Sequence, residues 1–219
     1  MTLEYWREYR TFFHIARSWG LHESTVWRTI KRVEDLLIKS KAFTVPGKKQ
    51  LQLSDHEIEF IVVDVAETPI ERPKKKQKRY YSGKKKRHTL KSQVVVNGRT
   101  RQVICTAHGR GSTHDFALYK ASRLELRESL ELLADSGYQG LAKLHERSRT
   151  PKKKSKKRHL TKDERRANRE LSRSRIVVEN VIRSLKIFRI LLERYRNRRK
   201  RFSLRFNLIA GLYNFELSL

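Results

Sequence analysis

Residues 58–65 read Ile-Glu-Phe-Ile-Val-Val-Asp-Val, and this short apolar run decides the fold class. A run of this length, rich in β-branched residues, is typical of a strand whose two faces are both covered. Further strands are predicted at 132–135 and at 89–96 and 101–107, the last two joined as a hairpin by Asn97-Gly98. Helical patterns lie between and after the strands, at residues 115–130, 141–147, 162–194 and 204–217. This order predicts an α/β fold, with a mixed sheet and flanking helices.

The first 45 residues carry a different, helical pattern. Residues 3–9 and 12–16 read as short helices, and Gly20 supplies a left-handed stop. A longer helix, capped by Ser24 or its neighbour, follows at 25–40, with a packed face formed by Val26, Ile30, Val33 and Leu37. We therefore predict a helix-turn-helix domain at 1–45, followed by a linker at 46–57. The second helix of such a unit enters the major groove by its N-terminal residues, here Glu23, Ser24, Thr25 and Arg28, with Lys31 nearer the phosphates. The DNA-binding candidates are Ser24, Thr25, Arg28 and Lys31.

The positive charge is unevenly distributed along the chain. The 219 residues include 52 Lys+Arg and 23 Asp+Glu, a formal net charge of +29. Half of the basic residues lie in three segments that contain no acid, at 72–91, 147–158 and 194–205, and the rest of the chain carries only +3. Three such segments between patterned regions favour phosphate contacts at several places over solvated loops or a localisation tract. The candidate DNA-binding lysines in the first two segments are Lys74, Lys75, Lys76, Lys84, Lys85, Lys86, Lys152, Lys153 and Lys154.

Composition excludes several classes of protein. No run approaches the roughly 18–20 consecutive apolar residues of a membrane span, and the first residues lack the pattern of a signal peptide. The single cysteine, Cys105, excludes an internal disulfide and a multi-cysteine zinc site, and its apolar strand predicts a place in the core. We therefore expect a soluble, intracellular and strongly basic protein whose partner is a polyanion.

Two aspartates share the same sequence context. Asp64 and Asp135 each follow three apolar residues and are predicted to end buried strands. The carboxyl ends of neighbouring strands are where sites form in α/β sheets, and turn initiation after a strand is the equal alternative. A third carboxylate, Glu179, shares the polar face of a long helix with Arg175 and Lys186, where i,i+4 ion pairs on a solvated face are the alternative. Taken together, three carboxylates among cations suit two-metal phosphoryl transfer with Mg²⁺.

These carboxylates lie in motifs that resemble those of the DDE transposases of bacterial insertion sequences, in the groups numbered four and five. Asp64 lies in VVDVAETPIERP and Asp135 in LLADSGYQG. Glu179 lies in RIVVENVIRSLK, which matches an R-x3-E-x6-K signature through Arg175 and Lys186. The resemblance covers nearly the whole chain. It implies a ribonuclease H-like catalytic domain at 58–219, with basic arms at 72–91 and 147–158.

The resemblance also implies a chemistry for these residues. It implies Asp64, Asp135 and Glu179 as catalytic ligands of Mg²⁺, with two ions expected and Mn²⁺ able to substitute. It places Arg175 and Lys186 close to DNA. The implied reaction is cleavage and joining of double-stranded DNA, at transposon ends and in target DNA, by a homodimer or larger synaptic complex. The implied location is the bacterial cytoplasm, in association with the nucleoid.

Two other functions explain part of the pattern. The first is a catalytically inactive or truncated transposase derivative that acts as a DNA-binding protein or repressor, since relatives usually have a further helical segment before the region of residues 3–6. The second is a basic RNA-binding protein, which explains the charge but not the placed carboxylates. Mg²⁺-dependent nicking of DNA separates the enzyme from both.

A few residues have two interpretations each. Asp115 either acts near the metals together with His114 or, as we favour, caps the helix that follows. Glu67 either assists the metal site or pairs with the adjacent basic arm. Tyr80 and Tyr81, between two lysine runs, either stack on unpaired bases or stiffen the arm.

Overall fold

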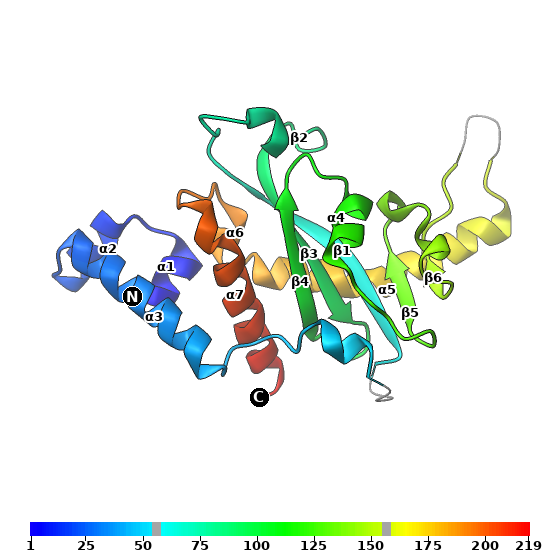
Figure 1. The fold of residues 1–219 in the computed structure, drawn as a ribbon, viewed down its shortest axis with the longest axis horizontal. Coiled ribbons are helices and arrows are strands. Elements are labelled where there is room, and N and C mark those ends of the chain that lie inside the picture. Colours follow the sequence, from blue (N-terminus) through cyan, green and yellow to red (C-terminus); the bar gives the residue numbers. More distant parts are fainter. Residues whose placement is uncertain (54–57, 155–158) are drawn as a thin grey trace.

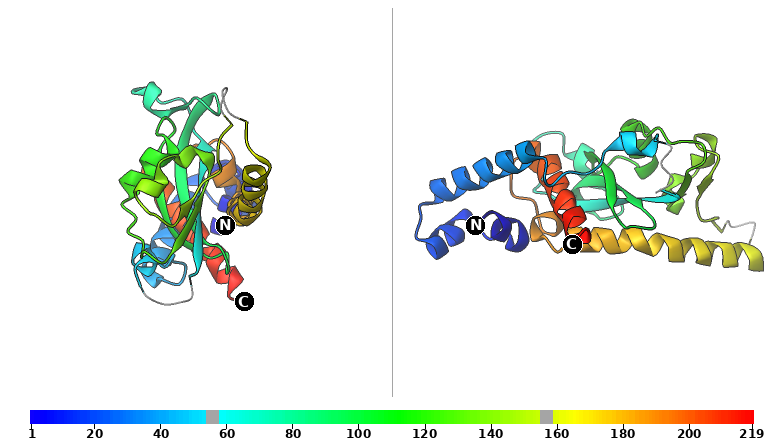
Figure 2. Two further views of the ribbon diagram at one scale, coloured as in Figure 1. Left: turned by 90° about the vertical axis from the view of Figure 1, so that its right-hand side faces the viewer. Right: turned by 90° about the horizontal axis from the view of Figure 1, so that it is seen from below.

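The computed structural model describes residues 1–53, 58–154 and 159–219. Within these ranges it confirms the predicted fold class, because helices at the N-terminus lead into a mixed sheet with flanking helices (Figure 1). Figure 2 shows an elongated molecule, with the N-terminal helices at one end and the start of the long helix α5 at the other. No helix of the described residues is long and apolar enough to cross a membrane.

The N-terminal helices are α1 (Thr2–Glu8), α2 (Phe12–Trp19) and α3 (Glu23–Ser40). Gly20 ends α2 in the left-handed region, at φ 63°, as the sequence predicts. The cap of α3 is different from the predicted one. His22 has extended backbone, and its ring nitrogen accepts a hydrogen bond from the Ser24 N–H at 3.3 Å. Ser24 therefore lies inside the first turn, because the helix begins one residue before it.

The sheet is built around β1 (Phe60–Pro69) and β3 (Arg87–Asn97), which pair antiparallel. The hairpin partner of β3 is β4 (Val103–Arg110), and the Asn97 side chain accepts hydrogen bonds from the N–H groups of Arg99 and Thr100 in the connection. The sheet extends on the other side of β1 by two parallel strands, β5 (Glu131–Ala134) and β6 (Ser148–Arg149). A short strand, β2 (Tyr81–Ser82), pairs with the start of β3.

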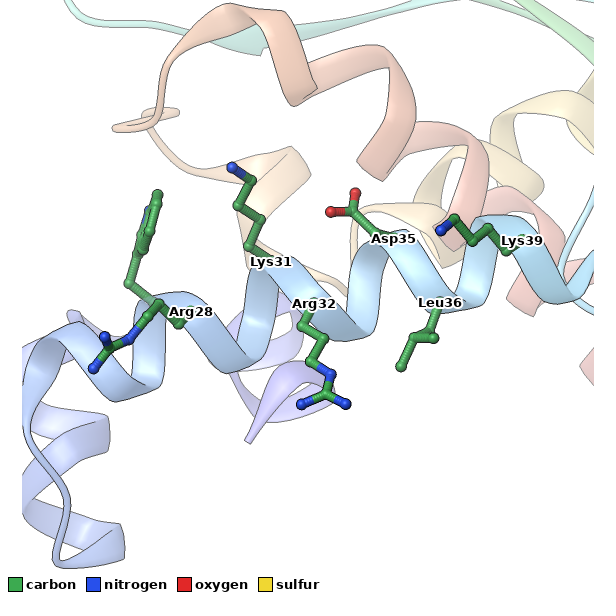
Figure 3. Close-up of a pocket in the computed structure, with 7 residues that line it drawn as sticks. Arg28, Lys31, Arg32, Asp35, Leu36 and Lys39 are labelled. Carbon is green, nitrogen blue, oxygen red and sulfur yellow. The ribbon is translucent and has the colours of Figure 1, made fainter.

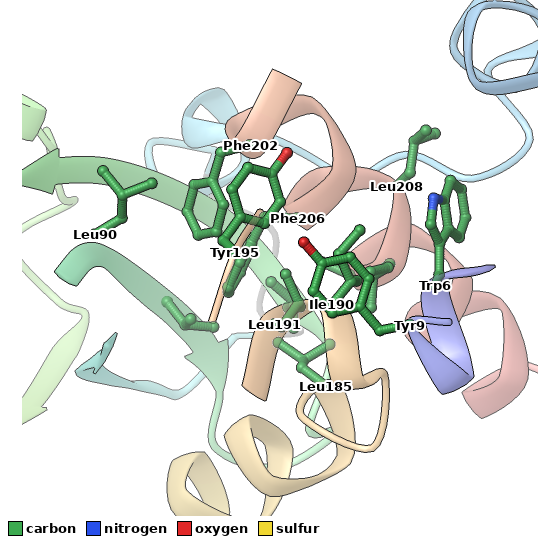
Figure 4. Close-up of a cluster of buried hydrophobic side chains, with 14 of the residues drawn as sticks. Trp6, Tyr9, Leu90, Leu185, Ile190, Leu191, Tyr195, Phe202, Phe206 and Leu208 are labelled. Carbon is green, nitrogen blue, oxygen red and sulfur yellow. The ribbon is translucent and has the colours of Figure 1, made fainter. Parts of the chain in front are cut away.

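Both faces of β1 are covered, as the apolar run 58–65 predicts. On one face Val62 joins a cluster with residues of α5 and α7 and with aromatic residues of α1. Part of this cluster is drawn in Figure 4, where Phe202 lies close to both Tyr195 and Phe206. On the other face Ile61 and Val63 pack with residues of α4 and of β5. Residues alternate between the two clusters along the strand, which fixes the direction in which the polar residues after Val63 point.

The remaining helices are α4 (Asp115–Ser122), α5 (Lys162–Leu185), α6 (Arg189–Leu192) and α7 (Phe202–Leu217). Short 3-10 helices are η1 (Lys48–Leu51), η2 (Gln77–Tyr80), η3 (Ser136–Tyr138), η4 (Leu141–Lys143) and η5 (Arg199–Arg201). The long helix α5 contacts β1, β3 and β5, and α7 contacts β4 and α3.

Two predicted helices are too long, and a third is not formed. The helix at 162–194 ends at Leu185, because the chain after it is drawn to the end of β1: Thr68 Oγ1 donates to the Leu191 carbonyl at 2.7 Å, and the Tyr195 N–H donates to the Pro69 carbonyl at 2.8 Å. The helix at 115–130 ends at Ser122, where Arg123 takes a left-handed conformation.

The predicted helix at 141–147 is the third, and it is replaced by a 3-10 turn and an approach to β6. The Leu132 N–H donates to the Arg147 carbonyl at 2.9 Å, so this part of the chain already follows the edge of the sheet. The linker at 46–57 is also more ordered than a linker pattern suggests, since Leu51 in η1 is buried. Residues 54–57 of it lie outside the described residues.

Candidate active site and DNA-binding surface

Asp64 and Asp135 lie next to each other on neighbouring parallel strands. The register of β1 and β5 pairs Val63 with Ala134, and each aspartate is the following residue. The prediction that Asp64 ends its strand is wrong, because β1 continues to Pro69 by pairing with β3. It is β5 that stops, at Ala134, so that Asp64 stands where its strand loses one neighbour. The two aspartates therefore lie side by side at the C-terminal end of β5.

Helix α5 supplies the third carboxylate and an arginine. Arg175 Nη1 lies 3.9 Å from Asp135 Oδ1, and its Nη2 lies 3.9 Å from Glu179 Oε1. The Arg175 side chain is 12% exposed, whereas that of Glu179 is 59% exposed. The Nε of Arg175 is buried without a hydrogen-bond partner among the described residues. One guanidinium therefore contacts the carboxylates of both Asp135 and Glu179.

The side chains do not gather around one point. Among the described residues, no group of three or more His, Cys, Asp or Glu side chains is close enough together to hold one metal ion. Asp64 and Asp135 supply the carboxylate oxygens that hard cations such as Mg²⁺ prefer, and the Arg175 guanidinium separates Glu179 from them. The chemistry of the aspartate pair thus fits a divalent cation, whereas the exposed Glu179 side chain contacts Arg175.

The surroundings of Asp64 act on its charge in opposite directions. Burial raises its pKa above the ordinary aspartate value, and the charges of Asp135 and Asp115 raise it further. The Val65 N–H, which donates to Asp64 Oδ1 at 2.7 Å, and the positive charge of Arg175 lower the pKa. Burial has the largest effect, so the Asp64 carboxyl is held less acidic than a solvated aspartate.

Lys186 stands at the C-terminal end of α5 and is close enough to Asp64 and Glu67 of β1 for their charges to act on it. Burial lowers its pKa, and the charge of Lys85 lowers it as well, while the charges of Glu67 and Asp64 raise it. The basic turn before β3 therefore approaches the same place as the end of α5. Glu67 itself accepts a hydrogen bond from Thr89 Oγ1 at 2.8 Å, which makes it a partner of residue 89 in the arm at 72–91.

A buried ion pair near the aspartates has no signal in the sequence. Lys91 Nζ lies 2.7 Å from Asp115 Oδ1 and 2.7 Å from the Thr113 carbonyl oxygen, and the Lys91 side chain is 10% exposed. The prediction that Asp115 caps α4 is wrong. His114 occupies the cap position, and no side chain forms a capping hydrogen bond. The Asp115 carboxylate instead accepts a hydrogen bond from Lys91 Nζ. A lysine in a strand reads as a solvated residue, so only the fold reveals this pair.

Tyr138 is a second residue that sequence reasoning missed. Burial raises the pKa of its phenol well above the ordinary value, and the charges of Asp64, Asp115 and Asp135 act in the same direction. Its hydroxyl is buried without a hydrogen-bond partner among the described residues. The only sequence signal was its place in the LLADSGYQG motif, three residues after Asp135.

The candidate DNA-reading residues lie along α3. Ser24, Arg28 and Lys31 are exposed and Thr25 is half-buried. Arg28 Nη2 donates to Ser24 Oγ at 3.4 Å. Figure 3 shows the exposed side of this helix, with Arg28 and Lys31 on it together with Arg32, Asp35, Leu36 and Lys39.

The lysines of the two basic arms are exposed: Lys74, Lys75, Lys76, Lys84, Lys85, Lys86, Lys152, Lys153 and Lys154. The arm at 72–91 is docked rather than free, because the Tyr80 ring lies between Arg199, at 4.3 Å from its centroid, and Arg110, at 6.0 Å. The Tyr80 ring is therefore in contact with arginines of the protein itself, whereas Tyr81 is 43% exposed. In the arm at 147–158, Lys152 Nζ pairs with Glu164 at 3.2 Å, and residues 155–158 lie outside the described residues.

The structure thus combines paired aspartates on neighbouring strands with a glutamate and an arginine from a long helix, and three N-terminal helices precede them. Residues 63–214 match the family described as DDE superfamily endonuclease, and residues 1–41 match the helix-turn-helix of DDE superfamily endonuclease. The chain belongs to the DDE superfamily endonucleases. Members of this superfamily generally use divalent metal ions, and the helix-turn-helix implies DNA as a partner.

The chain is also similar to a protein of a known element. It is 53% identical, over all of its 219 residues and 79% of the relative, to the probable transposase for insertion sequence element IS702 of Microchaete diplosiphon. No solved structure matches the chain significantly. The predicted resemblance to the DDE family is thereby confirmed.

Proposed function

We propose that this chain is the transposase of an insertion sequence and that it cuts and joins double-stranded DNA by Mg²⁺-dependent phosphoryl transfer. The observation that carries the proposal is the adjacency of Asp64 and Asp135 on β1 and β5, with Arg175 between Asp135 and Glu179. The 53% identity to a probable transposase over the whole chain supports the same reaction. The proposed domains are 1–45 for the helix-turn-helix, 46–57 for the linker and 58–219 for the catalytic part.

The metal ligands in this proposal are Asp64, Asp135 and Glu179. Mg²⁺, when bound, supplies Lewis-acid stabilisation of the attacking and leaving oxygens of an in-line displacement, and two ions suit that task. Asp64 and Asp135 supply adjacent carboxylate oxygens. Glu179, on an exposed part of α5, reaches them once the Arg175 guanidinium turns away.

Arg175 and Lys186 act on the DNA in this proposal. An arginine fork matches two phosphate oxygens, so the guanidinium exchanges Asp135 and Glu179 for the reacting phosphate when DNA arrives. Lys186 lies near Asp64 and adds a positive charge to the same phosphate. In the first step a water oxygen forms a new bond to phosphorus while the P–O3′ bond breaks, and a proton passes from the water to the leaving oxygen, which gives a 3′-hydroxyl and a 5′-phosphate. In the second step the oxygen of that 3′-hydroxyl forms a new P–O bond with a phosphate of target DNA, while the P–O3′ bond of the target strand breaks and the proton passes to its leaving 3′ oxygen.

The other contacts of the DNA belong to the exposed basic residues. Ser24, Thr25 and Arg28 on α3 meet the duplex in the major groove, and Lys31 meets its phosphates. The lysines of the arms at 72–91 and 147–158 meet phosphates on either side of the site. Two ends must be joined in one event, so we propose a homodimer or larger assembly as the active form.

The test is a nicking assay with purified protein, Mg²⁺ and a plasmid that carries the ends of the element. We expect Asp64→Asn and Glu179→Gln to lose at least about a hundredfold in nicking rate. Glu170→Gln is the matched control, because Glu170 lies on the same helix as Glu179 and is 57% exposed against 59%. Nicking by Asp64→Asn or Glu179→Gln at the rate of Glu170→Gln overturns the assignment.

A second function is favoured by one observation. Arg175 lies between Asp135 and Glu179, and the described residues hold no ready-made cluster of three metal ligands. A DNA-binding protein or repressor without nuclease activity fits that arrangement. In that case the wild-type protein binds the ends and gives no Mg²⁺-dependent or Mn²⁺-dependent nicking.

A further inference from the structure

A basic groove of about 780 Å³ lies away from the aspartates, between α3 and the segment 196–201 that precedes α7. Its apolar side chains include Phe12, Trp27 and Ile30 from the helix-turn-helix. Its charged side chains are all basic: Lys31, Arg196, Arg198, Lys200, Arg201 and Arg205. The third basic segment of the sequence is therefore one wall of a groove, and α3 is the other.

Half of these cations are already engaged. Arg201 and Arg205 pair with the buried carboxylate of Glu34, and Arg201 also pairs with Asp35. The Arg196 guanidinium lies 4.2 Å from the centroid of the Tyr9 ring and donates to the Tyr9 carbonyl.

The other three cations have no carboxylate. Within the described part of the chain, the side chains of Lys31, Arg198 and Lys200 form no hydrogen bond or ion pair, and Lys31 only lies over Trp27, with its Nζ 5.2 Å from the ring centroid. No acidic residue is among the described residues that line the groove. Three free positive charges thus face one hollow, which attracts a polyanion.

The walls of the groove are fixed in place. Glu34 Oε1 accepts from Arg205 Nε at 2.6 Å and Glu34 Oε2 accepts from Arg201 Nε at 2.8 Å, which ties α3 to η5 and α7. Asn197 accepts from Tyr5 Oη at 2.9 Å and donates to Tyr9 Oη at 3.0 Å. A charged wall that is held by buried contacts loses little freedom on binding, so the groove is preorganised for its ligand.

The groove adjoins the exposed side of α3. Trp27 and Lys31 line it and also line the neighbouring hollow of about 450 Å³ on the outer face of that helix, beside Arg28, Arg32 and Lys39 (Figure 3). A long anion that lies along α3 therefore continues into the groove. The sugar–phosphate backbone of a duplex has that length, and its charges repeat with a regular spacing along both strands.

We propose that this groove holds the sugar–phosphate backbone of the DNA duplex that α3 reads, with Lys31, Arg198 and Lys200 as its phosphate contacts. The proposal rests on the proposed function only in taking DNA as the ligand. One wall comes from the helix-turn-helix and the other from the segment between α6 and α7, so one strand of DNA is gripped by both parts of the protein. Binding of a transposon end by the helix-turn-helix then also fixes where that DNA lies relative to the catalytic part.

The test uses the full chain, in EDTA, with a mixed-sequence duplex of about three helical turns as the probe. We expect Arg198→Gln/Lys200→Gln to weaken binding about tenfold or more at 0.1 M salt and to reduce the slope of log Kobs against log salt by about 2. Both residues lack partners among the described residues, so the fold is expected to survive, which circular dichroism checks. The matched control is Lys143→Gln/Lys162→Gln, two exposed cations in η4 and at the start of α5, at the end of the molecule away from α1–α3 (Figure 1).

Two results overturn the proposal. One is a duplex affinity and salt slope in the groove variant that equal those of the control variant. The other is a loss confined to structured RNA, with duplex binding unchanged. Binding in EDTA requires no catalysis, so an absence of nicking by the wild type contradicts the proposed function and leaves this measurement unaffected.

Discussion

Glu34 Oε1 lies 2.6 Å from Arg205 Nε, and both side chains are buried although they are 171 residues apart in the sequence. The same carboxylate accepts from Trp6 Nε1 at 3.2 Å and from Arg201 Nε at 2.8 Å. A buried carboxylate is tolerated only when its oxygens are satisfied in this way. The helix-turn-helix and the last helix therefore share one polar centre, and the N-terminal helices are packed onto the rest of the protein through it.

Breaking this centre is expected to cost much of the stability of the fold. Glu34→Ala leaves Arg205 buried and uncompensated, so we expect a loss of about 3 kcal/mol or more in the free energy of unfolding, measured by urea denaturation. Asp35→Asn is the control, because the Asp35 side chain is 47% exposed and its pair with Arg201 contributes about 1 kcal/mol at most. Equal losses in the two variants would show that Glu34 is not the centre of the interface.

Gly211 of α7 permits a close approach between the last helix and the chain after α3. A Cβ built on Gly211 lies 2.3 Å from the carbonyl carbon of Phe43, a backbone atom that no side-chain rotation can move away. We expect Gly211→Ala to destabilise the protein by about 1–3 kcal/mol, despite the better helix propensity of alanine. Gly83→Ala, where a Cβ meets nothing within 4 Å, is the control and should change the unfolding midpoint little. A neutral or stabilising Gly211→Ala would contradict this packing.

Removing the guanidinium between Asp135 and Glu179 separates metal binding from catalysis. We expect Arg175→Gln to bind Mn²⁺ several-fold more tightly in the absence of DNA, because a positive charge 3.9 Å from both carboxylates is lost. We expect the same variant to nick DNA at least about tenfold more slowly, because the proposed phosphate contact is lost with it. Calorimetric Mn²⁺ titration and the nicking assay measure the two effects. Arg183→Gln, on the last turn of α5, is the control for the metal affinity, and weaker Mn²⁺ binding by Arg175→Gln than by this control would refute the prediction.

His108 makes the fold sensitive to moderate acid. Burial lowers its pKa to about 4, and its ring lies edge-on to Phe202 and Phe206. The unfolded chain binds a proton near the ordinary histidine pKa of about 6.5 and the folded protein does not, so stability is fully present above that pH and falls as the pH drops towards 4. Between pH 7.5 and pH 5 this loss is about 2 kcal/mol for one histidine.

The measurement is urea denaturation at the two pH values, for the wild type and for His108→Gln. For each protein, the free energy of unfolding at pH 5 is subtracted from that at pH 7.5. This pH difference is expected to be about 2 kcal/mol smaller in His108→Gln than in the wild type. His159→Gln, which changes an exposed histidine, provides the reference. A pH difference that stays unchanged in His108→Gln would mean that the ring is not the group responsible.

The strands β1, β3, β4 and β5 and the β3–β4 pairing were predictable because their pattern is local, whereas β2, β6 and the other pairings were not predicted. The run at 58–65 and the Asn97-Gly98 signal led to β1 and to the β3–β4 hairpin, and both faces of β1 are covered as expected. Helix ends were less predictable, because tertiary hydrogen bonds set them. The helix predicted at 162–194 ends at Leu185 in the structure. The hydrogen bond from Thr68 Oγ1 to the Leu191 carbonyl, which draws the following chain to β1, joins residues 123 positions apart, and a local pattern does not show it.

In the candidate site, too, features set by local sequence were predicted and features set by tertiary contacts were missed. The aspartates were found from local context, and the pairing of Val63 with Ala134 explains why two distant motifs meet. Lys91 and Glu34 were missed, because a charged residue in a strand or helix reads as solvated until its partner is known. The partners, Asp115 and Arg205, lie 24 and 171 residues away. The catalytic and DNA-binding roles of the predicted residues stay predictions until the variants above are made.

Helix α7 has a consequence for the order in which the chain is made. It spans Phe202–Leu217, and it packs both on β4 of the sheet and on α3 near the start of the chain. A ribosome synthesises from the N-terminus, so α3 is made together with Trp6 but long before Arg201 and Arg205, the two cations that neutralise the Glu34 carboxylate. The nascent N-terminal helices therefore spend translation without their final partner, and release of the last helix is the event that completes them.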